Sequence, residues 1–93
     1  MIVGVMEIDF LIYDSFSLKD KRRVVKSLIE RVKHNFNVSI AEVDNLDKHN
    51  FATVGVAVVS NEHAFIDRVF DKLIAFVESS FAVEIVDIRR GQL

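Results

Sequence analysis

Two hydrophobic periods alternate along this chain, and their order limits the folds that it can adopt. Residues 2–13 change character at every second position. The even positions from Ile2 to Ile12 are all apolar or glycine, whereas the odd ones are mixed and include Glu7 and Asp9. A period of two predicts a β-strand with one face on a core. We therefore expect the even side chains beneath a covering layer, with Glu7 and Asp9 on the opposite face.

Residues 19–36 have the spacing of an amphipathic helix instead. Ser17, followed three residues later by Asp20, resembles a capping box and predicts where this helix begins. The buried stripe of this helix is predicted to comprise Val24, Val25, Leu28, Ile29, Val32 and Phe36.

A second helical stretch is predicted to end near Ser79, and Ser60 or Asn61 can cap its start. Phe65 and Phe76 lie beside its apolar stripe, where they either pack against the first helix or stay partly exposed. The stripe itself comprises Ile66, Val69, Phe70, Leu73 and Val77.

Three further strands are predicted at Val38–Val43, Phe51–Ser60 and Phe81–Arg89, with Gly91–Leu93 as a short tail. The stretch Phe51–Ser60 is nearly continuous in alanine and valine, which is typical of a central strand shielded on both sides.

The resulting order is strand, helix, strand, strand, helix, strand. Two right-handed crossovers in that order predict an α+β, ferredoxin-like βαββαβ fold. It has a four-stranded antiparallel sheet, both helices on one face, and the first and third strands at its centre. No proline, linker or repeat divides the 93 residues, so a single domain over 1–93 is expected.

Charge is distributed unevenly along the chain. Its net charge is −2, yet the segment from Lys19 to Lys33 holds seven cations and two anions. At about 100° per residue, three of these cations follow one flank of the first helix, and two others lie close by. Such a basic face favours binding of an RNA phosphate backbone. The predicted nucleic-acid-binding residues are Lys19, Arg22, Arg23, Lys26 and Lys33.

Two other interpretations of these cations stay open. They can form an ordinary solvated helix face. Lys21 and Arg22 can instead pair with carboxylates at the strand ends, and the helical angle of Lys21 points it toward the buried side.

Other chemistry is less well supported by the sequence. Glu7 and Asp9 on the open sheet face would repel phosphate, which argues against RNA binding through stacked bases on the sheet. Asp44, Asp47 and His49 could together hold a divalent metal, but they are also ordinary turn residues, and we expect neither metal nor cofactor. No glycine-rich phosphate loop, nucleophile elbow or His-Glu-x-x-His motif is present, so an enzyme is not expected.

The environment and assembly of the protein can also be anticipated. There is no cysteine, no apolar run of about 20 residues and no basic signal-peptide start, which predicts a cytoplasmic protein without a membrane partner. Apolar residues on the open sheet face predict a homodimer through that face or through an edge strand. The residues concerned are Val3, Val5, Leu11, Ala57 and Val59.

Three segments stand out as possible family motifs: Ser17-Leu18-Lys19-Asp20-Lys21-Arg22, then Ala41-Glu42-Val43-Asp44 with Asp47, then the stretch from Ala52 to Asn61. Together they resemble the YlxP family of small bacterial proteins. The resemblance implies a ferredoxin-like fold without an assigned function. Because family members are often encoded beside translation factors and a ribosome-binding factor, it also implies a link to ribosome assembly or translation, with ribosomal RNA or the ribosome as partner. At one position the chain departs from the family pattern: Phe51 stands where we would expect a polar or basic residue.

Overall fold

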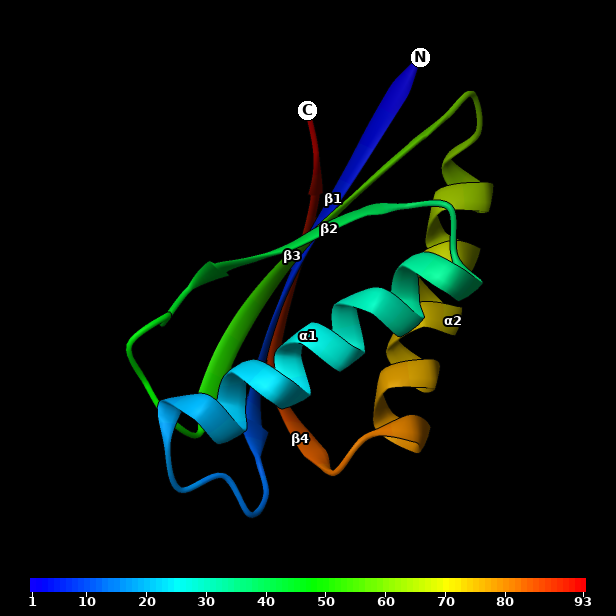
Figure 1. The fold of residues 1–93 in the computed structure, drawn as a ribbon. Coiled ribbons are helices and arrows are strands. Elements are labelled where there is room, and N and C mark those ends of the chain that lie inside the picture. The colour runs from blue at the N-terminus through cyan, green and yellow to red at the C-terminus, as the bar shows by residue number, and fades with distance from the viewer.

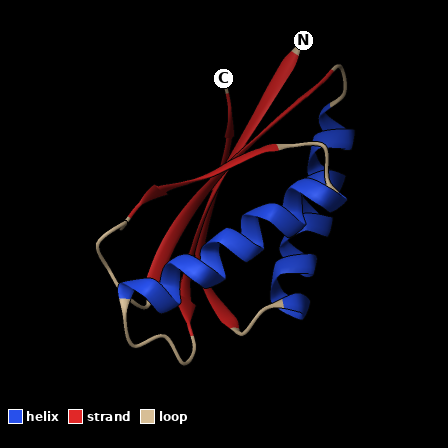
Figure 2. Cartoon of the chain, viewed as in Figure 1, coloured by secondary structure: helices blue, strands red, loops and turns tan.

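A computed structural model describes all residues, 1–93, and confirms the predicted order of elements (Figure 1). The elements are β1 (Ile2–Ile12), α1 (Leu18–Asn35), β2 (Ser39–Asp44), β3 (Phe51–Ser60), α2 (His63–Ser80) and β4 (Val83–Gln92). The strands form one antiparallel sheet in the order β2-β3-β1-β4, so β1 and β3 are central, as predicted. Both helices cover the same face of this sheet, and the other face, here called the open face, carries no layer (Figure 2). Neither helix is long and apolar enough to cross a membrane.

The core lies between the sheet and the two helices. From β1 it receives Met6, Ile8 and Phe10, which are at most 1% exposed, while Glu7 is exposed on the open face. The predicted register of β1 is thus confirmed. Gly4 belongs to the same buried row, and a Cβ atom there would collide with Cγ2 of Ile66 on α2. The missing side chain at Gly4 is what allows α2 to approach β1 this closely.

Phe76 of α2 packs between the end of α1 and the segment that leads from α2 to β4. Its ring makes edge-to-face contacts with Phe36, at 5.7 Å between centroids, and with Phe81, at 6.1 Å. Phe65, the other aromatic residue beside the α2 stripe, is 43% exposed. The sequence left two outcomes open for these residues. Phe76 packs against the end of the first helix, and Phe65 is partly exposed.

The end of the chain differs from the prediction. β4 begins at Val83 and continues through Gln92, so Gly91 and Gln92 are not a tail but pair with Val5 and Gly4. The reason is that β1 is long enough to offer ladder partners along this whole stretch. A register shift between Asp9 and Phe10 leaves Val86 of β4 without a partner residue on β1.

Two other expectations were wrong in detail. Neither Ser60 nor Asn61 occupies the N-cap of α2, which is Glu62. The Ser60 hydroxyl instead accepts a bond from the Glu62 N–H at 3.1 Å. β3 is central, but it is not shielded on both sides, because nothing covers the open face. Val59 there is 62% exposed.

Candidate functional site

The first turn of α1 is fixed by its own side chains. The Ser17 hydroxyl accepts a hydrogen bond from the Asp20 N–H at 3.1 Å, as the capping-box pattern predicts. The Asp20 carboxylate accepts from the Phe16 N–H at 3.2 Å, one residue earlier than in the standard box. These bonds orient the basic segment that follows.

Lys21 lies on the buried side of α1 and is 0% exposed. Its ammonium donates to the Asn45 carbonyl oxygen at 2.5 Å and lies 2.9 Å from Oε2 of Glu42 on β2. This Glu42 oxygen is buried and accepts no hydrogen bond of good geometry, so Lys21 is its only compensating charge. The structural interpretation of Lys21 is confirmed, since it ties α1 to β2 and to the loop after β2.

The five predicted binding residues, Lys19, Arg22, Arg23, Lys26 and Lys33, are all exposed on α1, and together they are called here the basic face. None of them forms an ion pair, because the ion pairs of this structure involve only Lys21, Arg89 and Arg90. Pairing of Arg22 with a strand-end carboxylate is thus not observed. The charge of this face is available to a partner.

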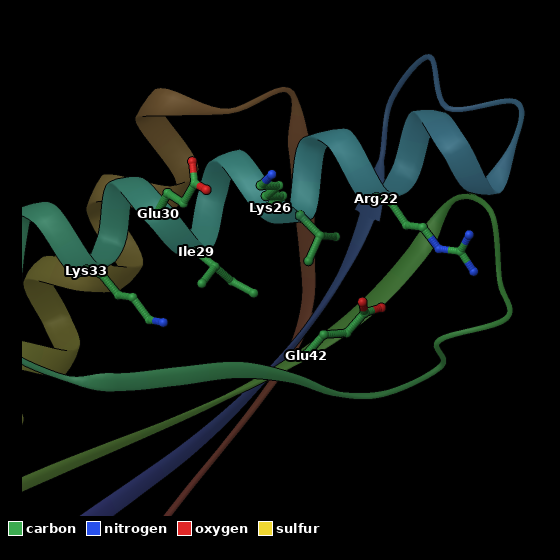
Figure 3. Close-up of a pocket in the computed structure, with 7 residues that line it drawn as sticks. Arg22, Lys26, Ile29, Glu30, Lys33 and Glu42 are labelled. Carbon is green, nitrogen blue, oxygen red and sulfur yellow. The ribbon is translucent and has the colours of Figure 1, made fainter.

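Three of the five, Arg22, Lys26 and Lys33, line a groove of about 350 Å³ between α1 and β2, here called the β2-side groove. Its apolar lining comes from Val25 and Ile29. Lys33 and Ile29 point from α1 toward β2 (Figure 3). Arg23 instead lines a separate groove on the other flank of α1, and Lys19 lines neither.

Two carboxylates also line the β2-side groove. That of Glu42 is compensated by Lys21, and that of Glu30 points away from β2 (Figure 3). With a rise of 1.5 Å per residue, the row from Arg22 to Lys33 spans about 16 Å along α1. A row of that length suits an extended polyanion, whose charges repeat along its backbone, better than one small anion.

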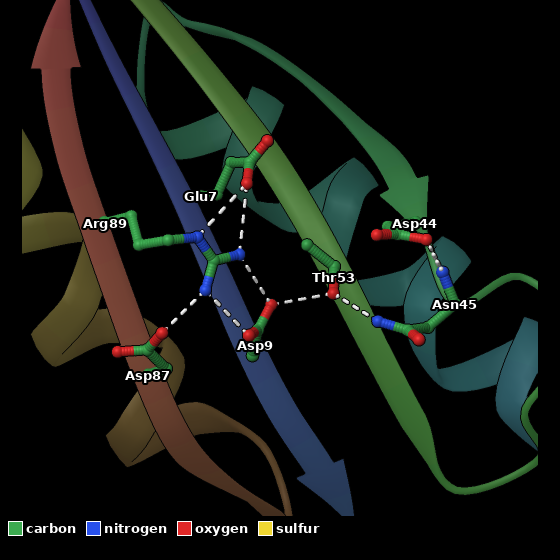
Figure 4. A network of polar contacts seen from close by, with 7 residues as sticks. All are labelled: Glu7, Asp9, Asp44, Asn45, Thr53, Asp87 and Arg89. Atoms are coloured by element: carbon green, nitrogen blue, oxygen red, sulfur yellow. Dashed lines mark hydrogen bonds and ion pairs between the residues drawn. The ribbon is translucent and has the colours of Figure 1, made fainter.

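The open face of the sheet carries a cation that, unlike those of the basic face, is paired with carboxylates. Arg89 of β4 donates to both oxygens of Asp9, at 2.8 and 3.0 Å, to Asp87 at 2.7 Å and to Glu7 at 3.0 Å (Figure 4). Hydrogen bonds from Arg89, opposed in part by burial, lower the pKa of Asp9 below its ordinary value, and these carboxylates raise the pKa of Arg89. Three carboxylates still outnumber one guanidinium, so the open face remains acidic here.

A chain of hydrogen bonds leads from this network to Lys21. Thr53 of β3 donates to Asp9 at 2.7 Å and accepts from the Asn45 side-chain amide at 2.8 Å (Figure 4). The carbonyl of Asn45 in turn accepts from Lys21. Asn45 has a positive φ of 59°, which asparagine tolerates better than most residues. Asn45 thereby links the Arg89 network on the open face, through Thr53, to Lys21 beneath α1.

The loop after β2 does not assemble a metal site. Nowhere does the structure bring together three His, Cys, Asp or Glu side chains that could hold an ion. The Asp44 carboxylate instead accepts from the N–H of the next residue, Asn45, at 2.7 Å, and the Lys48 N–H donates to the Asn45 carbonyl across the turn at 3.1 Å.

Sequence reasoning missed Arg89, and the period-two pattern offered only a weak signal for it. Once β4 is extended past Arg89, antiparallel pairing places this residue opposite Glu7. The network then follows, because cross-strand neighbours of opposite charge lie within reach of each other.

Comparison with known proteins places the chain in a family. Residues 3–90 match the family described as "Protein of unknown function (DUF503)". The chain is also 35% identical over 82 residues to the "Uncharacterized protein YlxP" of Bacillus subtilis (strain 168), an alignment that covers 88% of this chain and 89% of that protein. The chain therefore belongs to the DUF503 family of proteins of unknown function, the YlxP family that its motifs resemble.

Proposed function

We propose that this protein is a non-enzymatic accessory factor of translation that binds RNA, free or within the ribosome, through the basic face of α1. The observation that carries the proposal is the row of Arg22, Lys26 and Lys33 along the β2-side groove, with no ion pair to any of them. Lysine and arginine side chains placed on phosphates release condensed counterions, and this release drives binding without regard to sequence.

The buried pair beneath the groove supports the same proposal. Lys21 compensates Glu42 and holds α1 against β2, so the helix that carries the three groove cations is fixed on the sheet without any of them pairing with a carboxylate. The resemblance to the YlxP family, with its implied link to translation, makes ribosomal RNA the first partner to test.

The open face is a less suitable RNA surface. Glu7, Asp9 and Asp87 surround its only central cation, Arg89. Phosphates would meet a net negative surface there, whereas on α1 they would meet unpaired cations. The proposal therefore assigns RNA to the helix side of the molecule.

Filter binding of ribosomal RNA fragments at several salt concentrations tests the proposal. Replacing Arg22, Lys26 and Lys33 together with Gln should weaken binding to all sequences alike, because phosphate contacts carry no base information. For three contacts to a single strand, the slope of log affinity against log salt should become shallower by about 2.

Glu30→Gln is the matched control, because Glu30 lines the same groove as these cations. Removing its negative charge should leave binding equal or slightly tighter. If the parent protein shows no salt-dependent binding, or the triple variant keeps the parent's slope, the basic face is only a solvated surface.

A second candidate function is supported by the apolar part of the open face. Val59 is 62% and Val43 is 48% exposed, and exposed apolar clusters often mark partner surfaces. Arg89 pairs with Glu7 and Asp9 within one chain, which lowers the number of charges that a partner covering this face would have to compensate. Such a protein would be an oligomeric interaction or ligand-sensing module. Light scattering that reports only monomer at high protein concentration would exclude self-association.

A further inference from the structure

A second groove follows the other flank of α1, between this helix, the end of β1 and the segment Ser80–Ala82, and is here called the β4-side groove. It has a volume of about 290 Å³. Along α1 it is lined by Arg23, Ser27 and Arg31, which are spaced four residues apart and therefore follow one side of the helix. Neither arginine forms an ion pair.

Arg31 differs from every cation of the basic face because it lies on aromatic rings. Its guanidinium carbon is 4.7 Å from the ring centroid of Phe81 and 5.5 Å from that of Phe76. Phe76 is itself held edge-to-face by Phe36 and Phe81. A guanidinium over fixed rings is attracted to their π-electrons and loses little further freedom on binding a ligand. Arg31 is nevertheless an exposed residue and lines the groove.

We propose that the β4-side groove holds one unpaired nucleotide of the bound RNA, with its base stacked on the exposed side of the Arg31 guanidinium. The base would then form the outer layer of a stack whose inner layer is Phe81. Arg23 would pair with a neighbouring phosphate, and the Ser27 hydroxyl can donate a hydrogen bond to it. This inference rests on the proposed function and specifies its ligand as single-stranded RNA, because bases in a duplex are not free to stack on protein groups.

The surroundings of the groove restrict the path of the strand. Tyr13, which is 53% exposed, lines the β4-side groove and also borders a second hollow that contains Glu78 and Glu84. These carboxylates would repel a phosphate. The RNA backbone is therefore confined to the side of Tyr13 that carries Arg23 and Arg31.

Arg31→Lys tests the stacking, because lysine keeps the positive charge and loses the planar group. The probe is a fluorescently labelled single-stranded RNA of about 12 nucleotides, a length within the range bound by small single-strand-binding domains. Its affinity is measured by anisotropy and compared with that of the same RNA annealed to its complement. Arg31→Lys should weaken single-strand binding roughly tenfold, as expected for the loss of one stacked base, and leave duplex binding unchanged.

Arg23→Lys is the matched control, since Arg23 lines the same groove but lies over no aromatic ring. Its effect should be clearly smaller than that of Arg31→Lys and similar for both RNA forms. If the parent binds RNA through Arg22, Lys26 and Lys33, but Arg31→Lys behaves like Arg23→Lys or weakens both forms equally, the stacking site is wrong and the proposed function survives. If the parent binds neither RNA form in a salt-dependent way, the proposed function fails and this inference fails with it.

Discussion

Arg22 and Arg89 lie on opposite sides of the sheet and have opposite surroundings. Arg89 contacts three carboxylates, whereas Arg22 forms no ion pair. The difference comes from the backbone that carries each residue. The antiparallel ladder places Glu7 directly opposite Arg89, while the helix places Lys19 three residues before Arg22 and Lys26 four residues after it. One cation is neutralised by neighbouring carboxylates, and the other keeps an unpaired charge at the surface.

Lys21 shows how sharply this distinction can change between neighbours. It is adjacent to Arg22 in the sequence, yet it is fully buried against Glu42 and the Asn45 carbonyl. One position along a helix is a rotation of about 100°, enough to move a side chain from solvent to core. Paired cations therefore contribute to folding, and unpaired ones should matter for binding.

Lys21→Met should produce the largest loss of stability in this set. It removes the only charge that compensates the buried Oε2 of Glu42, and breaking a buried pair from one side typically costs about 3–5 kcal/mol. Urea unfolding of parent and variant gives the difference in unfolding free energy.

Adding Glu42→Gln to Lys21→Met should recover part of that loss, because a neutral amide replaces the uncompensated carboxylate. Arg22→Gln, one residue away and exposed, should change the unfolding free energy by no more than about 0.5 kcal/mol. If Lys21→Met and Arg22→Gln changed the unfolding free energy equally, the idea that only paired cations stabilise the fold would be wrong.

Arg89→Gln should have the next largest effect, and that effect should depend on pH. Bonds from Arg89 lower the folded-state pKa of Asp9 below its ordinary value of 3.8. A lowered pKa stabilises the fold at pH values above that ordinary value, and this stabilisation is lost as pH falls through the folded-state pKa. The variant should therefore have a lower Tm than the parent at neutral pH, and the two should converge in acid.

Thermal unfolding of both proteins at pH 7 and near pH 3 provides the measurement. A Tm difference that is unchanged between the two pH values would mean that Arg89 acts through packing of its side chain and not through Asp9. In that case the ion pairs of Arg89 on the open face would not contribute to stability, and the contrast with the unpaired cations of α1 would fail.

The fold and much of the basic face could be predicted because they depend on local periods. Alternation in β1 places Ile8 inside and Glu7 outside, and the helical angle places Lys21 inside. Such assignments need only the geometry of one element. The same reasoning predicted that Lys19, Arg22, Arg23, Lys26 and Lys33 lie on the exposed side of α1.

Arg89 and Arg31 could not be identified in the same way, because each depends on how two elements meet. The partners of Arg89 follow from the β1–β4 register, which includes a shift between Asp9 and Phe10. The stacking of Arg31 on Phe81 depends on where the segment between α2 and β4 meets α1. A period within one segment carries no information about either arrangement.

Replacing Arg22, Lys26 and Lys33 with Gln should have the smallest effect on stability, and its sign should depend on salt. Arg22 and Lys26 are four residues apart on one helix, and like charges at that spacing destabilise a helix by about 0.2–0.5 kcal/mol. The triple variant should therefore unfold at equal or slightly higher urea than the parent at about 0.01 M salt, where the screening length is about 30 Å. At about 1 M salt that length falls to about 3 Å, and the difference should vanish.

Glu30→Gln, which removes a carboxylate four residues after Lys26, should shift low-salt stability slightly downward. A triple variant that is less stable by more than about 1 kcal/mol at either salt concentration would mean that these cations stabilise the fold, as Arg89 is expected to do. They would then not be surface charges whose main role is to bind RNA.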